Sequence, residues 1–177
     1  SAMNVVLLSL GSNIHRTKNI RAALDSLSDI FGELTLSSVY ESEPVGFSGD
    51  CFYNLIVVLS TELSLKNLST TVKHIEDQNG RVRSGPRFSS RTLDIDIVQY
   101  ADWQGQYSGI ELPRPELYYN AFVLWPVAEL LPNSVDAKTG ESYANLWKSM
   151  AKQTEQKLWK VNFHWAGKCI SKAETLA

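Results

Sequence analysis

The sequence predicts an α+β protein in which helices pack on one antiparallel sheet. Four short runs rich in apolar and β-branched residues alternate with two segments that have the apolar spacing of amphipathic helices. Their order is strand, helix, strand, strand, helix, strand, which is the β-α-β-β-α-β arrangement of ferredoxin-like folds. With 177 residues, the chain is long enough for one domain with a sizeable core.

The first two elements are a buried strand and an amphipathic helix. The apolar run at residues 5–10 ends in Gly11-Ser12-Asn13, which predicts a central strand that leaves the sheet in a turn. From Thr17 onward, apolar residues recur with helical spacing at Ile20, Ala23, Leu24, Leu27, Ile30 and Phe31. Gly32 follows the last of these residues and predicts the end of the helix.

The middle of the chain predicts two strands, a second helix and a fourth strand. The two strands are residues 34–40 and 52–61, and the segment between them is a loop rich in Pro, Gly and Ser. Ser64 is suited to cap a helix that ends just before Gly80. The apolar stripe of that helix is Leu65, Leu68, Val72 and Ile75. The fourth strand is the LDIDIV segment at residues 93–98.

Beyond the fourth strand, the sequence predicts helical additions to the sheet. A proline-containing loop precedes an apolar segment at 122–131 that suits a packed helix, and residues 143–152 predict another short helix. Residues 158–163 predict a last strand, whereas residues 165–177 show no assignable pattern. There is no repeat or interdomain linker, so we expect residues 1–177 to form a single domain.

Composition and charge exclude several functional classes. The formal net charge of −2 argues against a general nucleic-acid or membrane-surface binder. The cysteines Cys51 and Cys169 are far apart and the three histidines are scattered, so a zinc site is not expected. No apolar run approaches the roughly 20 residues of a membrane span, and no signal peptide is evident. We expect a cytoplasmic protein with reduced thiols and with neither a nucleic-acid nor a membrane partner.

Two aspartates on the fourth strand are the first candidate functional residues. Asp94 and Asp96 alternate with Leu93, Ile95 and Ile97, so the carboxylates share one face of the strand and the apolar side chains share the other. Carboxylates at i and i+2 lie roughly 7 Å apart and can hold hard cations such as Mg²⁺ between them. The alternative is an ordinary half-buried strand with a solvated acidic face.

Four arginines precede the aspartates in a segment rich in Gly, Ser and Pro: Arg81, Arg83, Arg87 and Arg91. Guanidinium groups bind phosphate oxygens in bidentate fashion. The alternatives are a solvated basic loop or a nucleic-acid patch, although one cluster in an acidic chain does not make a basic face. A magnesium–nucleotide complex is complementary to both arginines and carboxylates, so their adjacency favours a phosphate-transfer site.

The chain lacks the common nucleotide-binding motifs GxxxxGK[ST] and GxGxxG and the motifs of protein kinases. Four blocks instead resemble the 6-hydroxymethyl-7,8-dihydropterin pyrophosphokinase family. The blocks are LSLGSN (8–13), YESEPVG with FYN (40–46 and 52–54), GRVR with PRFSSRTLDIDI (80–97), and LP with FVLWPVAELLP (112–132). The resemblance covers a core from residue 5 to residue 132.

The resemblance implies an ATP-dependent enzyme of folate biosynthesis. The family transfers the pyrophosphoryl group of ATP to the hydroxymethyl group of a dihydropterin and releases AMP. Two Mg²⁺ ions bound with ATP would be held by Asp94 and Asp96, while Arg81 and Arg91 match catalytic arginines of a loop that closes over the triphosphate. Further ATP contacts are implied for Glu76, Arg83, Arg87, Ile97 and Arg114. We expect these two small molecules to be the partners of a monomer.

A pterin is a flat ring with a hydrogen-bonding edge, so it needs stacking rings and a few polar groups. By the same resemblance, Phe52 and Phe122 match the stacking region and Phe88 a lid from the arginine segment. Asn54 matches the polar reader of the ring edge, with help from the backbone of Ser42 to Val45. Without the resemblance, each phenylalanine would be interpreted as core packing and Glu76 as a solvated helix residue.

Several positions depart from the family's usual residues, among them Glu43 where proline is frequent and a missing lysine near Ser84. Arg114 stands where histidine is usual, Asn120 where arginine is usual, and Phe88 where tryptophan is usual. Arg114 can still bind phosphate, whereas Asn120 carries no charge. We expect the chain to fold and to be an active enzyme with an altered ATP site. The alternatives are a diverged relative acting on another pterin and a non-catalytic protein that binds pterins or nucleotides.

Overall fold

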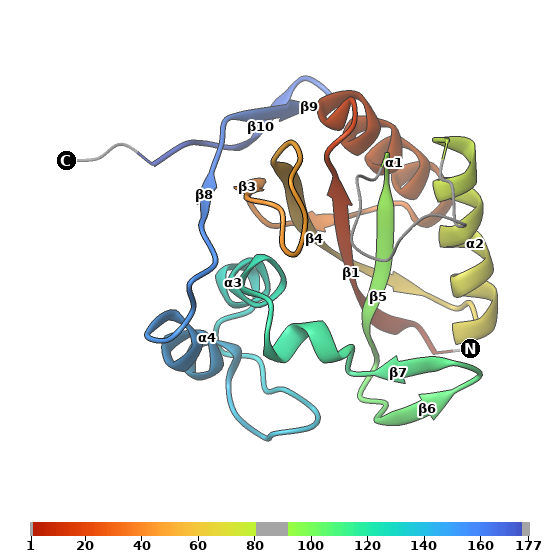
Figure 1. The fold of residues 1–177 in the computed structure, drawn as a ribbon. Helices are drawn as coiled ribbons and strands as arrows, with labels where there is room; N and C mark the ends of the chain where they lie inside the picture. The colour runs from red at the N-terminus through yellow and green to blue at the C-terminus, as the bar shows by residue number, and fades with distance from the viewer. Residues whose placement is uncertain (1, 81–91, 175–177) are drawn as a thin grey trace.

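The computed structural model describes residues 2–80 and 92–174, and its centre is an antiparallel sheet (Figure 1). The strands lie in the order β5 (Asp94–Tyr100), β1 (Asn4–Ser12), β4 (Phe52–Thr61), β3 (Tyr40–Ser42) and β8 (Leu158–Lys160). The short β2 (Thr35–Leu36) also pairs with β4, and every pairing is antiparallel. The predicted α+β fold with its β-α-β-β-α-β order is therefore confirmed.

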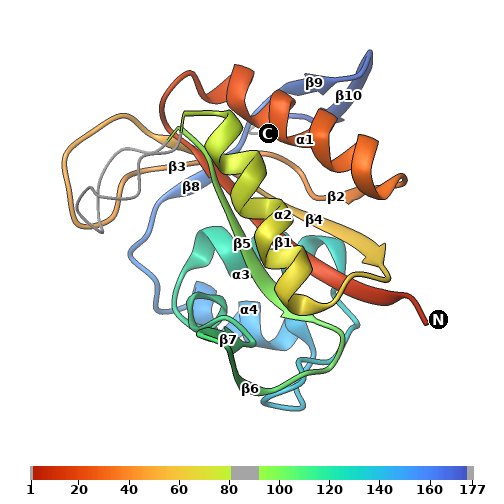
Figure 2. The same ribbon diagram turned by 90° about the vertical axis from the view of Figure 1, so that its right-hand side faces the viewer.

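The first two helices cover one face of the sheet (Figure 2). They are α1 (Arg16–Phe31) and α2 (Leu65–Gln78), and their apolar stripes pack on inward-facing residues of β1, β4 and β5. As predicted, Ser64 caps α2, since its hydroxyl accepts a hydrogen bond from the Asn67 amide at 3.1 Å. The main core lies between these helices and the sheet and includes Leu8, Leu10, Leu24, Leu55, Leu68 and Ile95.

The later helices cover the opposite face. A 3₁₀ turn (Pro115–Tyr118) leads into α3 (Ala121–Leu130), and α4 (Tyr143–Ala151) packs behind it. Trp125 of α3 stacks on Trp147 of α4 with ring centroids 5.2 Å apart, and it also contacts Tyr40 of β3. The predicted C-terminal helices are confirmed, and the sheet is sandwiched between two pairs of helices.

Two predicted strands are interrupted in the structure. The predicted strand at 34–40 is split into β2 and β3 because the Ser37 side chain takes the place of a backbone acceptor. The Ser37 hydroxyl accepts a hydrogen bond from the Ile56 amide at 2.8 Å. The run at 158–163 is split between β8 and β9 (Phe163–Trp165), and β9 pairs with β10 (Lys168–Ser171) in the part left unassigned from sequence.

The sequence interpretation missed a hairpin formed by β6 (Gly105–Tyr107) and β7 (Ile110–Leu112). Its two turn residues, Ser108 and Gly109, both have positive φ angles of 51° and 84°. Two consecutive positive angles are the signature of a tight hairpin turn, so the Ser-Gly pair was the available signal.

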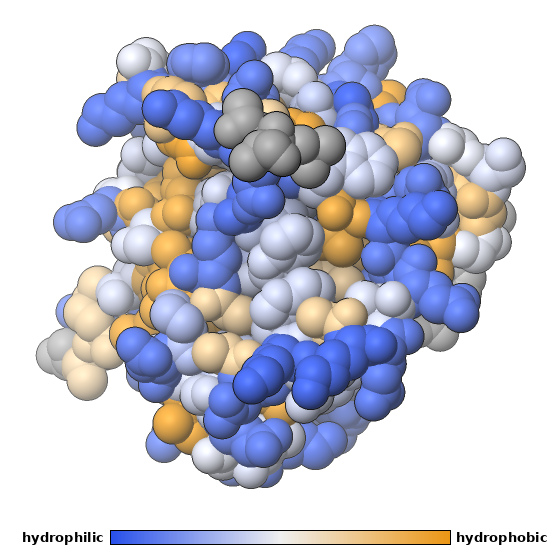
Figure 3. Space-filling model, turned by 90° about the vertical axis from the view of Figure 1, so that its left-hand side faces the viewer, coloured by the Kyte–Doolittle hydropathy of each residue, from blue (hydrophilic) through white to orange (hydrophobic). Residues whose placement is uncertain are grey.

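The surface on the side of β8 and α4 mixes hydrophilic residues with a band of hydrophobic ones (Figure 3). Within the described ranges, no helix is both long enough and apolar enough to cross a membrane.

Candidate active site

Polar and small residues form one end of the sheet face that also carries α3. Asn54, Gly11 and Asp94 lie side by side across β4, β1 and β5, and Ser9 pairs with Asp96 in the adjacent row. Further along the same face, the residues are apolar and pack on α3. The face therefore has an apolar half under the helices and a polar half that forms the floor of a cleft.

The predicted alternation on β5 is confirmed. Leu93, Ile95 and Ile97 are buried in the core beneath α1 and α2. Asp94 and Asp96 point to the opposite face and line the cleft. Both aspartates are only partly buried, so their carboxylates are accessible to a bound cation.

Gly11 keeps the middle of this floor open. A Cβ atom at position 11 would lie 3.2 Å from Asn54 Oδ1, which is tighter than ordinary van der Waals contact. Without that atom, the space between Asn54 and Asp94 is free for a ligand. This glycine belongs to the LSLGSN block, and its role follows from the register of three strands.

The cleft has a volume of about 520 Å³, which is in the range of small-molecule sites. One wall comes from the β3–β4 region and the other from the segment that leads into α3. The lining residues other than the floor are Ser42, Glu43, Val45, Phe47, Phe52, Arg114, Glu116, Tyr119, Asn120, Phe122, Val123 and Gln156.

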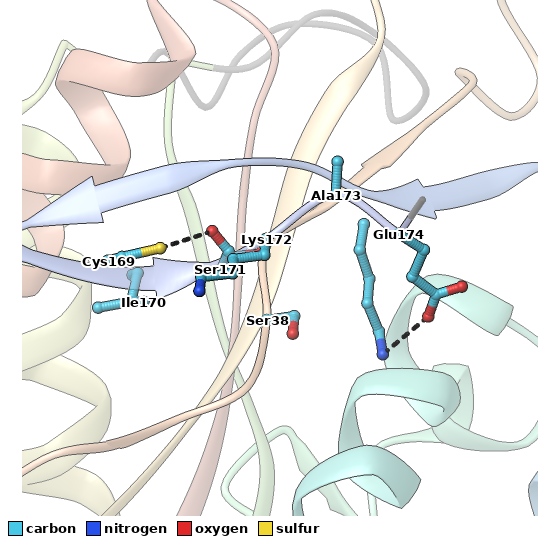
Figure 4. A pocket seen from close by; sticks show the side chains of 8 residues that line it. Ser38, Cys169, Ile170, Ser171, Lys172, Ala173 and Glu174 are labelled. Carbon is cyan, nitrogen blue, oxygen red and sulfur yellow. Dashed lines mark hydrogen bonds and ion pairs between the residues drawn. The ribbon is translucent and has the colours of Figure 1, made fainter. Parts of the chain in front are cut away.

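A second hollow of about 610 Å³ lies beside β10 (Figure 4). It is a shallow, open depression lined by Ser38, Lys160 and residues 169–174. Its Lys160 already pairs with Glu174 at 3.1 Å and with Glu129 at 3.6 Å. None of its lining residues was predicted to carry chemistry, so the cleft over β5 and β1 is the candidate site.

Arg114, for which the family resemblance implied an ATP contact, lies at the acidic end of the cleft. Its guanidinium is 3.5 Å from Asp96 Oδ1 and also pairs with Glu116. The Arg114 side chain is 36% exposed and that of Asp96 is 38% exposed, so the Arg114–Asp96 ion pair is weak and easily exchanged. A phosphate group entering the cleft would therefore meet an arginine next to a carboxylate.

Asn54 is fixed at the other end of the floor. Its side chain is buried, and Nδ2 donates a hydrogen bond to Ser42 Oγ at 2.6 Å. This contact turns Oδ1 towards the open space above Gly11. Asn54 thereby presents a fixed polar group to the cleft.

Phenylalanines form the apolar walls. Phe52 and Phe122, both predicted from the sequence, line the cleft, as does the exposed Val45. Phe47, which the sequence interpretation missed, packs edge-to-face on Phe52 with centroids 6.2 Å apart. Aromatic walls on both sides suit a flat heterocycle.

Two residues predicted to contact ATP do not line the cleft. Ile97 has its side chain in the core, so only its backbone is available. Glu76 is 6% exposed on α2, and its Oε2 accepts a hydrogen bond of 2.7 Å from the Ile95 amide. The interpretation of Glu76 as a solvated helix residue is therefore wrong. Glu76 holds the edge strand β5 at the residue between Asp94 and Asp96.

Five predicted site residues lie outside the described residues: Arg81, Arg83, Arg87, Phe88 and Arg91. The residues on either side of this segment lie close together, since a Cβ atom at Gly80 would be 3.9 Å from Thr92 Cγ2. Thr92 is in turn bound through its carbonyl oxygen to the Ser12 hydroxyl, at the end of β1. The segment is thus attached to the fold at the Asp94 end of the floor.

Comparisons with known proteins identify the family of the chain. Residues 7–132 match the family described as 7,8-dihydro-6-hydroxymethylpterin-pyrophosphokinase (HPPK). The 2-amino-4-hydroxy-6-hydroxymethyldihydropteridine pyrophosphokinase of Porphyromonas gingivalis is 37% identical over 136 residues, covering 73% of this chain and 92% of that protein. The Bacillus subtilis protein of the same name is 31% identical over 153 residues, covering 82% and 91%.

Solved structures show the same fold. A Plasmodium falciparum HPPK-DHPS protein superposes with a TM-score of 0.71 at 14% identity, covering 91% of this chain. A second HPPK-DHPS structure, described as in complex with substrates, gives a TM-score of 0.72 at 11% identity and covers 97%. This chain spans about half the length of those proteins, at 49% and 48%.

Proposed function

Because the chain belongs to the 7,8-dihydro-6-hydroxymethylpterin-pyrophosphokinase family, we propose that the cleft over Asp94 and Asn54 is its active site. Members of this family are pyrophosphokinases of folate biosynthesis, and the chain is an enzyme of this class. The observation that carries the assignment is the layout of one cleft: carboxylates at one end of the floor, a fixed amide at the other, and aromatic walls between them.

The acidic end would receive ATP with magnesium. Asp94 and Asp96 offer the oxygen ligands that Mg²⁺ prefers, from one face of a rigid strand. In residues 2–80 and 92–174 there is no cluster of three or more metal-binding side chains, so ATP oxygens and water would supply the other ligands. Two ions bound in this way would neutralise charge on the phosphates and help to align them.

The arginines would complete the phosphate site. Arg114 is beside Asp96 and would exchange its carboxylate partners for phosphate oxygens. Arg81 and Arg91, assisted by Arg83 and Arg87, are proposed to reach the triphosphate from the segment attached next to Asp94. These cations stabilise the charge that develops as the pyrophosphoryl group is transferred.

The other end would bind the hydroxymethyl-dihydropterin. Asn54 and the Ser42–Val45 backbone would hydrogen-bond the ring edge, and Phe52 and Phe122 would stack on its faces. The pterin hydroxyl would then attack the β-phosphorus, forming a new P–O bond, while the bond from the β-phosphorus to the α-phosphate oxygen breaks. AMP leaves with that oxygen, and the hydroxyl proton passes to solvent. Catalysis rests on positioning and charge stabilisation.

The test is AMP formation from ATP, Mg²⁺ and 6-hydroxymethyl-7,8-dihydropterin. We expect one AMP for each pterin diphosphate, and loss of both products in Asp96→Ala. Glu62→Ala, which changes an exposed carboxylate ahead of α2, is the matched control and should retain activity. Wild-type AMP formation no faster than that of Asp96→Ala would refute the assignment. Pterin binding without turnover would instead indicate a non-catalytic binding protein. We also propose that the monomer is the active form.

A further inference from the structure

One lining residue of the cleft comes from a part of the chain beyond the family match. Gln156 lies between α4 and β8, whereas the match ends at residue 132. Its Oε1 accepts a hydrogen bond of 2.7 Å from the Ala121 amide, which is the first residue of α3. Its Nε2 donates to Asn120 Oδ1 at 3.1 Å. Gln156 therefore caps α3 in place of Asn120, whose own side chain forms no capping bond.

The same short segment also holds the opposite wall. The carbonyl oxygen of Lys157, the next residue, accepts a hydrogen bond of 3.2 Å from the Glu43 amide. Leu158 then pairs with Ser42, as β8 extends the sheet beyond β3. Residues 156–158 thus connect the start of α3 to the start of the loop that carries Val45 and Phe47.

We propose that Gln156 is a positioning residue for the pterin, acting by fixing the first turn of α3. This inference rests on the proposed function. Phe122 is the second residue of α3, so the capping bond to Ala121 sets where its ring stands relative to Phe52 on the other wall. Asn120 is neutral, and its side-chain oxygen is already bound to Gln156. The carboxylates and Arg114 at the ATP end have no contact with Gln156 among those described.

The test compares Gln156→Met with Gln153→Met. Methionine matches glutamine in length but cannot form either hydrogen bond, and Gln153 is an exposed residue three positions earlier. In Gln156→Met, we expect the pterin Kd and KM to rise about 5- to 20-fold, as the loss of two hydrogen bonds predicts. The Kd for MgATP and kcat should change less than about twofold, because only the pterin wall moves. Gln153→Met should behave as wild type.

Hydrogen exchange of α3 gives a readout that needs no ligand. Amides at the start of α3 should exchange faster in Gln156→Met than in wild type, with α1 unchanged as the internal reference. An unchanged pterin Kd in Gln156→Met, or an equal loss of pterin and MgATP affinity, would overturn the inference. A wild-type protein that binds no pterin would instead refute the proposed function, so the two failures are distinguishable.

Discussion

Removal of the Glu76 carboxylate should weaken both the fold and the nucleotide site, although Glu76 does not line the cleft. Glu76 is buried on α2, and its Oε2 accepts a 2.7 Å hydrogen bond from the Ile95 amide. Among residues 2–80 and 92–174, β5 is an edge strand of the sheet, and no strand pairs with this amide on that side. Glu76→Ala leaves the amide without its acceptor, at the residue between Asp94 and Asp96.

The size of the effect follows from that hydrogen bond. Bonds to a charged group contribute about 1.5–3 kcal/mol, so Glu76→Ala should lower the free energy of unfolding by about 2 kcal/mol. For a chain of this length, that loss lowers Tm by roughly 4–8 °C. Displacement of β5 should also raise the Kd for MgATP about tenfold, because Asp94 and Asp96, the proposed metal ligands, are both on this strand. Thermal unfolding followed by circular dichroism, and calorimetric titration with MgATP, measure the two effects.

Two further variants make this prediction specific. Glu76→Gln retains an oxygen that can accept the Ile95 bond but loses the charge, so about half of the stability should be recovered. Gln78→Ala changes an exposed residue of the same helix and should shift the unfolding free energy by less than about 0.5 kcal/mol. If Glu76→Ala had the Tm and MgATP affinity of Gln78→Ala, the argument that Glu76 anchors β5 would be refuted.

Three other outcomes are expected. Gly11→Val would place a Cβ atom 3.2 Å from Asn54 Oδ1. Pterin affinity measured by fluorescence should therefore fall at least about tenfold, while the circular dichroism spectrum is retained. A pterin affinity equal to that of wild type would contradict the inference that Gly11 keeps the floor of the cleft open. Asp94→Asn should raise the MgATP Kd about tenfold without changing weak binding of metal-free ATP, and an equal effect on both would count against a metal role. Burial of the Tyr143 side chain and, to a smaller extent, the negative charge of the nearby Asp136 raise the pKa of Tyr143 to about 12 from its ordinary value of 10. Tyr143 ionises at a lower pH in the unfolded chain than in the folded protein, so the free energy of unfolding should fall between about pH 10 and 12. This fall should be less steep in Tyr143→Phe. Urea titrations that give the same dependence of the unfolding free energy on pH for both proteins would disprove the contribution of Tyr143.

Much of the fold was predictable because its signals are local. The helical spacing around Leu24 and the capping serine of α2 predicted both helices on the first face, within one or two residues of their ends. The two-residue period of LDIDIV predicted which side chains of β5 enter the core. The interruption of the predicted strand at 34–40 was missed because Ser37 binds the backbone of β4, a partner that no local pattern reveals.

The cleft depended more strongly on tertiary structure. Phe52, Asn54 and Phe122 were identified through resemblance to a family, since either phenylalanine alone would be assigned to core packing. Phe47 is the one aromatic residue of the loop at 43–51 and carried no separate signal. Gln156 lies 35 residues along the chain from the Ala121 amide that it binds, so its role was invisible until the chain was folded.

The sequence by itself determined the order of strands and helices, the face of β5 that carries the two aspartates, and the chemistry expected of arginines placed next to them. These properties depend on residues a few positions apart, where backbone geometry alone fixes which side chains share a face. The tertiary structure decided that Gly11 separates Asp94 from Asn54, that Glu76 anchors β5, and that residues 156–158 connect both walls of the cleft. Those contacts depend on strand register and on how distant segments pack, and both are set by the whole core together.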